Sequence, residues 1–189
     1  MNIARILYPV KVLGPGNRIG IWLCGCNRVC KGCSNPELWQ QKREYEVTVD
    51  ELLDLLKRLS VSHHVDGFTI SGGEPMLQAD ELSVLVEHLK AISEDILIYT
   101  GFQIEELVQK HNPSITTILD SITVLIDGAY IEELNDDTVL RGSSNQRVHI
   151  MNPAYQNKYD QYLDKSHNQI QNFITADGIV SVGIHHRGF

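Results

Sequence analysis

The sequence predicts an α/β fold built on a parallel β-sheet. Short apolar runs alternate with segments of helical periodicity between residues 19 and 126, and this alternation is typical of parallel strands joined by right-handed crossovers. A glycine-rich or polar motif follows each apolar run. Because ligands of such sheets bind beyond the carboxyl ends of the strands, these motifs predict one site at that edge of the sheet.

Four apolar runs are predicted to be strands: residues 19–23, 68–70, 96–99 and 122–126. The first leads into the cysteine-rich segment. The later runs end in Ser71-Gly72-Gly73, Thr100-Gly101 and Asp127-Gly128.

Helices are predicted between these strands. Thr48 and Glu51 form a capping box, and apolar residues then recur at helical spacing at positions 52, 55, 56 and 59. A second helix is expected from Asp80, with apolar residues at 82, 85, 86, 89 and 92. A short helix is expected over 104–110 and a loop over 113–117.

The C-terminal part has a different pattern. Residues 155–165 are expected to form a helix. Residues 170–175 and 179–184 flank Ala176-Asp177-Gly178, which predicts a β-hairpin with an Asp-Gly turn. The polar tail, residues 185–189, is expected to be mobile.

Composition limits the class of protein. A chain of 189 residues makes one domain, or one domain with an appendage, and at 42% hydrophobic it can bury a core. Its net charge of −8, with scattered basic residues, argues against nucleic-acid binding. No apolar run approaches the roughly 18 residues of a membrane span, and residues 1–9 lack a signal-peptide pattern. A cytoplasmic protein is expected.

Three cysteines, Cys26, Cys30 and Cys33, stand at C-x3-C-x2-C spacing. Thiolates are the usual ligands of iron–sulfur clusters, and a cubic [4Fe–4S] cluster has four irons. Three ligands leave one iron open, and an open iron can chelate a small molecule. The spacing therefore favours a catalytic cluster, which is oxygen-labile and implies anaerobic work, over a purely electron-carrying one.

Other interpretations of these cysteines remain open. Structural zinc usually requires two C-x2-C pairs or a Cys/His mixture, and disulfides are not expected without a secretory signal. Cys24 could be a fourth ligand that closes the cluster. We interpret it instead as a small buried residue at a strand end.

This cysteine spacing is the signature of the radical S-adenosylmethionine (SAM) superfamily. Within it, the chain resembles the anaerobic ribonucleoside-triphosphate reductase activating proteins. The most family-specific match is the Arg-Gly-Ser-Ser-Asn-Gln run from Arg141. The other matching segments are 14–18, 25–33, 35–39, 71–75, 100–102 and 124–128. The resemblance covers residues 1–151, which defines a radical SAM core and a C-terminal extension, residues 152–189.

The resemblance implies a partial (β/α)6 barrel, open on one side, with the cluster at the carboxyl-end face. It implies two cofactors, a [4Fe–4S] cluster and SAM. Reductive cleavage of SAM gives a 5′-deoxyadenosyl radical, which removes a hydrogen from a glycine of a large glycyl-radical enzyme. That partner is expected to be anaerobic ribonucleotide reductase, and reduced flavodoxin is the implied electron donor.

The resemblance also implies roles for individual residues. The cluster ligands are Cys26, Cys30 and Cys33. The segment that hydrogen-bonds the amino group of the SAM methionine consists of Gly72, Gly73 and Glu74, and for Glu74 the alternative is that it fixes the glycine turn.

Further SAM contacts are expected in three places. The cluster loop is expected to pass near the adenine, through Gly32, Cys33 and Ser34. Thr100 and Asp127 end strands on the ligand face, where contacts to ribose or methionine are plausible. Arg141 could pair with the SAM carboxylate. For Thr100, Asp127 and Arg141, the alternative role is loop capping or a surface ion pair. The histidines, including those at 63, 64, 149, 185 and 186, are expected to be solvated or in the core.

Two alternative functions remain. The extension is compatible with a radical SAM enzyme that acts on another peptide or on a small molecule. A non-catalytic iron–sulfur electron carrier would use Cys24 as the fourth ligand.

Overall fold

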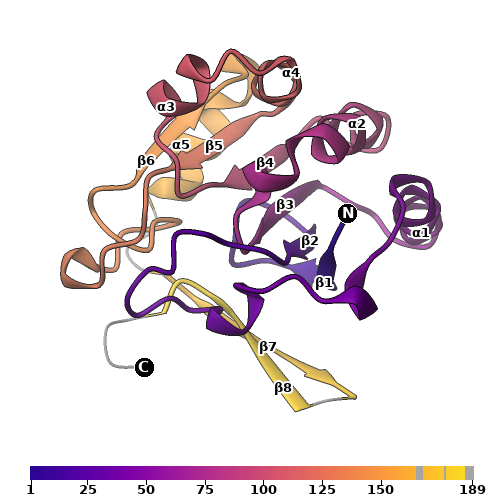
Figure 1. Ribbon diagram of the computed structural model, residues 1–189, viewed down its shortest axis with the longest axis horizontal. Coiled ribbons are helices and arrows are strands. Elements are labelled where there is room, and N and C mark those ends of the chain that lie inside the picture. Colours follow the sequence, from indigo (N-terminus) through magenta and orange to yellow (C-terminus); the bar gives the residue numbers. More distant parts are fainter. Residues whose placement is uncertain (165–167, 177, 186–189) are drawn as a thin grey trace.

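The computed structural model describes residues 1–164, 168–176 and 178–185. Its main feature is a six-stranded sheet whose spatial order follows the chain order (Figure 1). The four central strands are parallel, whereas the two edge strands pair antiparallel to their neighbours. The strands are β1 (Ile3–Val10), β2 (Arg18–Leu23), β3 (Gly67–Gly72), β4 (Ile96–Tyr99), β5 (Val124–Asp127) and β6 (Arg147–Ile150).

The predicted α/β architecture with a largely parallel sheet is confirmed, but the sequence did not reveal β1 and β6. Residues of β2 are all buried, and those of β4 and β5 nearly all, so they stand out as apolar runs. Most residues of β1 and β6 are only half-buried. Edge strands therefore lack the continuous apolar pattern of strands covered on both faces.

Four helices cover one face of the sheet: α1 (Val49–Ser62), α2 (Ala79–Leu89), α3 (Ile104–Gln109) and α4 (Pro113–Ser121). The expected capping box of α1 is present, with Thr48 and Glu51 each accepting from the other's backbone N–H. Leu56 of α1 and Leu85 of α2 are fully buried against strand residues such as Ile70. Short 3-10 turns lie at Pro36–Leu38, Arg43–Tyr45, Pro75–Gln78, Glu132–Leu134 and Pro153–Tyr155.

The expected loop at residues 113–117 is wrong, because this segment begins α4. The Asn112 side chain accepts hydrogen bonds from the backbone N–H groups of Ser114 (2.8 Å) and Ile115 (3.2 Å). Pro113 occupies the first helical turn, where a missing N–H leaves no bond unmade. The Asn112-Pro113 pair, which suggests a loop in the sequence, instead begins the helix, with Asn112 as its N-cap.

The C-terminal extension packs on the opposite face of the sheet. It contains α5 (Gln156–Leu163) and a hairpin of β7 (Ile170–Thr175) and β8 (Gly178–Gly183). Tyr159 packs in a cluster with Leu97 and Ile126, and Val182 packs with Trp22. The expected helix and hairpin are confirmed where described; Lys165, Asp177 of the turn, and the tail from His186 lie outside the described residues.

A buried polar network fixes α5 to the sheet. The fully buried Arg18 guanidinium, from the start of β2, lies 3.0 Å from the Asp95 carboxylate, which precedes β4. Lys158 of α5 donates to the same carboxylate at 2.6 Å, and the Tyr159 hydroxyl donates to it at 2.5 Å. The Arg18 Nε also donates to the Thr69 hydroxyl at 2.7 Å.

Within the ranges described, no helix combines the length and the apolar character needed to cross a membrane.

Candidate functional site

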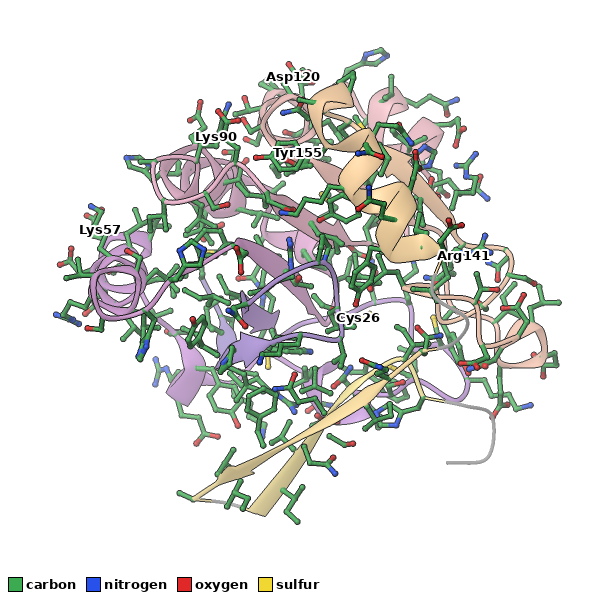
Figure 2. The ribbon with its side chains drawn as sticks, turned by 180° about the vertical axis from the view of Figure 1, so that it is seen from behind. Cys26, Lys57, Lys90, Asp120, Arg141 and Tyr155 are labelled. Carbon is green, nitrogen blue, oxygen red and sulfur yellow. The ribbon has the colours of Figure 1, made fainter. Side chains whose placement is uncertain are left out.

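A cavity of about 190 Å³ opens at the carboxyl ends of the parallel strands, and Cys26, Cys30 and Cys33 all border it. In Figure 2, Cys26 lies near the open end of the β7–β8 hairpin, where β8 ends. The ends of β3 and β4 border the cavity as well. The structure therefore brings the three expected cluster ligands to the predicted edge of the sheet.

The cluster loop, residues 26–33, is held by its own backbone. The N–H of Gly25 donates to Leu38 O at 2.9 Å, and the N–H of Cys26 donates to Trp39 O at 2.8 Å. Within the loop, the N–H of Cys33 donates to Cys30 O at 3.2 Å. The loop thus folds around its cysteines and leaves the three thiols partly exposed at the cavity.

The donor set fits an iron–sulfur cluster. In the described part of the chain, no three His, Cys, Asp or Glu side chains are placed around a single metal ion, whereas in a cubic cluster each thiolate binds a different iron. The indole N–H of Trp39, which borders the cavity, is buried without a hydrogen-bond partner among the described residues. A bound group with acceptor atoms, such as cluster sulfides, would satisfy that donor.

Burial raises the pKa of the Cys30 thiol, and the neighbouring Cys33 raises it further. A thiolate at this position therefore depends on a nearby positive charge. Iron ions supply such a charge, and metal binding to thiols displaces their protons.

Cys24 lies apart from these ligands. It is fully buried in an apolar cluster with Trp22 and Leu38, and it does not border the cavity. Its carbonyl accepts from the Gln78 side chain at 2.8 Å, and burial raises the pKa of its thiol. The interpretation of Cys24 as a small buried residue at a strand end is confirmed.

Gly72 and Gly73 border the cavity and also bring two backbones together. The N–H of Gly73 donates to Leu23 O at 2.7 Å. A Cβ on Gly72 would lie 2.3 Å from Leu23 O, and one on Gly73 would lie 2.3 Å from Gly25 O. Only glycine therefore lets the end of β3 lie against the chain that enters the cluster loop.

The Glu74 carboxylate connects β3 to β4. It accepts hydrogen bonds from the N–H of Met76 (3.0 Å), the hydroxyl of Thr100 (2.8 Å) and the N–H of Gly101 (2.7 Å). Glu74 is almost completely buried, and this burial raises the pKa of its carboxyl despite the three donors. Both of its oxygens are thus engaged within the protein.

The other expected contact residues divide into two groups. Ser34 and Thr100 border the cavity, although the Thr100 hydroxyl donates to Glu74. Gly32, Asp127 and Arg141 do not border it. The Arg141 guanidinium donates to Gln146 O at 3.0 Å.

Asp127 is engaged in an ion pair beside the sheet. Its carboxylate accepts from Arg147 Nη2 at 2.5 Å and from the N–H of Ile104 at 2.7 Å. Burial works against the charged form, but the Arg147 guanidinium and the Ile104 N–H hold the pKa of Asp127 below its usual value.

Sequence reasoning missed several residues at the cavity. Arg28, inside the cluster loop, borders it; its guanidinium stacks 4.1 Å above the Phe102 ring and lies 3.2 Å from Glu106. Arg5 of β1 borders the cavity and pairs with Glu37. The position of Arg28 between two ligand cysteines was a usable signal, whereas β1 carried none.

The hairpin was also missed as part of the site. Residues 181–185, from β8 and just beyond it, border the cavity, so His185 belongs to the site rather than to bulk solvent. Nothing in the sequence indicated that this distant segment returns to the cysteines.

Comparisons with known proteins agree with this site. A family described as a 4Fe-4S single cluster domain matches residues 12–149. The anaerobic ribonucleoside-triphosphate reductase-activating protein of Enterobacteria phage T4 is 35% identical over 153 residues, which cover 78% of this chain and 93% of that protein. The proteins of the same name from Vibrio cholerae and Salmonella typhimurium are 34% and 32% identical, each covering 75% of this chain and 94% of the relative.

Proposed function

Because the chain belongs to the family of anaerobic ribonucleoside-triphosphate reductase-activating proteins, which carry a single 4Fe-4S cluster domain, we propose that it is a radical SAM enzyme. It installs a glycyl radical on an anaerobic ribonucleoside-triphosphate reductase. The observation that carries this proposal is the convergence of Cys26, Cys30 and Cys33 on one cavity at the carboxyl ends of the parallel strands.

The chain's own residues hold and orient the cofactors. The thiolates of Cys26, Cys30 and Cys33 would hold three irons of a [4Fe–4S] cluster. When bound, that cluster would supply the electron for the reductive cleavage of SAM. The surrounding protein excludes water and positions the reacting atoms.

Four residues that border the cavity are kept as SAM contacts: Gly72, Gly73, Ser34 and Thr100. Glu74 acts indirectly. Its carboxylate accepts hydrogen bonds from Thr100 and Gly101 and so holds them beside Gly72 and Gly73. We assign no cofactor contact to Gly32, Asp127 or Arg141, which do not border the cavity.

The sheet and its helices correspond in this proposal to a partial (β/α)6 barrel. Residues 1–151 form the catalytic core, in agreement with the family match over residues 12–149, and residues 152–189 form an extension. Reduced flavodoxin is the proposed electron donor. The burial of Cys24 away from the cavity argues against a closed cluster and therefore against a simple electron carrier.

The test is anaerobic. The cluster is reconstituted, dithionite and SAM are added, and 5′-deoxyadenosine is quantified with and without the reductase. Formation of 5′-deoxyadenosine together with a glycyl signal in electron paramagnetic resonance supports the proposal, and a Cys30→Ala variant should show neither. 5′-Deoxyadenosine without a glycyl signal on the reductase would indicate another substrate. No 5′-deoxyadenosine from an intact cluster would contradict radical SAM chemistry.

A further inference from the structure

The C-terminal hairpin meets the cavity along its backbone. Residues 181–185 border the cavity without interruption. Successive side chains of a strand point to opposite faces of its sheet, and Ser181 bonds Asn172 across the hairpin while Val182 packs against the core. Residues 181–184 all border the cavity although side chains alternate along a strand, which indicates that the cavity meets an edge of β8 rather than one face. We call residues 181–184 the β8 edge.

β8 has one edge without a partner strand in the described part of the chain. It pairs with β7 in register from Thr175↔Gly178 to Ile170↔Gly183, and within the described residues this sheet has only these two strands. An edge strand presents a row of backbone N–H and C=O groups that can pair with another strand. Ser181 carries a small side chain and Gly183 carries none, so neither covers that row with a bulky group.

The β8 edge is held in position by contacts near the open end of the hairpin. Beside the cavity, the Asn135 side chain donates to His185 O at 2.8 Å. On β7, the Gln171 side chain accepts from the N–H of Lys11 at 2.9 Å and donates to Pro9 O at 2.7 Å. Val182 is buried against the sheet. A fixed edge binds a partner with less loss of conformational entropy than a mobile one.

We propose that the β8 edge is a docking strand for the polypeptide on which the enzyme acts, which pairs with it as an added β-strand. This inference rests on the proposed function, in which the substrate is a glycine within a protein chain. An extended polypeptide repeats its N–H and C=O groups at the same spacing as the edge. Pairing at the cavity would deliver the glycine backbone next to the three cysteines.

The occupant is the polypeptide rather than SAM for a second reason. The hairpin lies beyond residue 149, outside the segment that the cluster-domain family matches. The relatives are covered over 93–94% of their own length by 75–78% of this chain. The cluster-domain match does not extend to the hairpin, so the hairpin is suited to contacts with the particular reductase polypeptide on which this chain acts.

Hydrogen exchange on the reconstituted full-length protein tests this assignment. The probe is a synthetic peptide that spans the radical-bearing glycine of the reductase. SAM alone should leave exchange at the β8 edge unchanged, while 5′-deoxyadenosine formation after addition of dithionite shows that SAM is bound and cleaved. Adding the peptide should slow exchange at residues 181–184 by about tenfold or more, the effect of edge amides that enter a ladder. The same peptide with methylated backbone amides should not protect them.

Two variants of one strand provide a matched comparison. Ser181→Lys places a long charged side chain at the β8 edge, a change that blocks edge pairing. Ile179→Lys makes the same change on β8 at a side chain that is 73% exposed and does not border the cavity. Ser181→Lys should weaken peptide binding about tenfold, as loss of one or two backbone hydrogen bonds would. Ile179→Lys should leave both peptide affinity and SAM binding unchanged.

Each other outcome is decisive. Protection of residues 181–184 by SAM alone would make the β8 edge a cofactor contact and overturn the docking assignment. So would unchanged exchange in the presence of peptide, or equal peptide affinity in both variants. If the reconstituted protein forms no 5′-deoxyadenosine from SAM, the proposed function fails and the docking assignment fails with it.

Discussion

At the residue scale, Glu74 shows how a motif can be correctly located and differently used. The Gly-Gly-Glu-Pro segment was expected to face SAM, and its glycines do border the cavity. The carboxylate instead accepts three hydrogen bonds from Met76, Thr100 and Gly101. Glu74 therefore sets the distance between the ends of β3 and β4, and so the shape of the cavity between them.

Replacing Glu74 should destabilise the protein and loosen the cavity. Glu74→Ala removes the acceptor of two backbone N–H groups, so the free energy of unfolding should fall by about 2–4 kcal/mol. Urea denaturation measures this change. The matched control is Glu87→Ala on α2, whose exposed side chain should change stability little; an equal loss in both variants would contradict the role given to Glu74.

The raised pKa of Glu74 also predicts a pH dependence. The folded state holds the proton more tightly than the unfolded state, whose carboxyl titrates near 4.5. The contribution of this group to the free energy of unfolding is therefore most favourable at low pH and decreases as pH rises from 4.5 through the folded-state pKa. Glu74→Gln cannot titrate, so the difference in stability between wild type and this variant should vary with pH in that window. A constant difference would be the contrary result.

Cys24 and Cys30 should respond differently to the same substitution. Cys24→Ala removes a sulfur from an apolar cluster, so it should reduce stability by about 1 kcal/mol but keep iron content and SAM cleavage. Cys30→Ala removes a cluster ligand and should lose both. Iron analysis and 5′-deoxyadenosine formation measure the two effects; loss of the cluster in Cys24→Ala would restore the closed-cluster interpretation.

Residue roles were predictable where spacing alone determines chemistry. The three ligand cysteines lie within one loop, so their convergence follows from the sequence. Asp127 was expected at the ligand, yet its carboxylate is taken by Arg147, twenty residues away in the chain but opposite it in the β5–β6 ladder. That pairing depends on an edge strand that the apolar pattern does not reveal.

At the element scale, a charged network and apolar packing together fix the position of α5. Asp95 accepts from Lys158 and Tyr159 of α5 while it faces the buried Arg18 guanidinium. The helix is short and mostly polar, so this network and two tyrosines are its main attachment to the sheet.

Breaking that network at its centre should be costly. Asp95→Ala leaves the Arg18 guanidinium buried without its carboxylate, and the free energy of unfolding should fall by about 3–5 kcal/mol. Lys158→Ala removes a partly exposed partner and should have a much smaller effect. Denaturant midpoints measure both changes. Equal losses would show that the Lys158 ammonium, and not the Arg18 guanidinium, accounts for most of the stabilisation by Asp95.

The N-terminus of α4 depends on one side chain. Asn112→Ala removes the acceptor for Ser114 and Ile115 N–H, so stability should decrease by about 1 kcal/mol. Asn112→Ser retains a capping oxygen and should recover most of that loss in thermal unfolding. A full loss in the serine variant would contradict the capping role.

Strands that are buried on both faces of the sheet, and helices that begin with a capping box, were predictable from the sequence. The central strands and α1 meet those conditions. Most residues of β1 and β6 are only half-buried, and α4 begins with residues that favour loops in isolation. Tertiary contacts decide such elements, and a single sequence does not display them.

At the scale of the whole molecule, we expect the fold to be independent of the cluster. The three apolar clusters include Cys24 but none of the ligand cysteines. Removing iron with a chelator should therefore abolish the visible absorption and leave far-ultraviolet circular dichroism nearly unchanged, unlike small metal domains that unfold without their ion. Cooperative unfolding on chelation would contradict this prediction.

The return of the hairpin to the cavity has an evolutionary consequence. The thiols are carried by the amino-terminal part of the chain, and the opposite wall by a segment added near the carboxyl terminus. Insertions or substitutions in that segment can alter the wall while the inherited chemistry stays intact. Selection can thus act on the two parts of one site separately. Such an enzyme can acquire a new polypeptide substrate while its cofactor chemistry stays active.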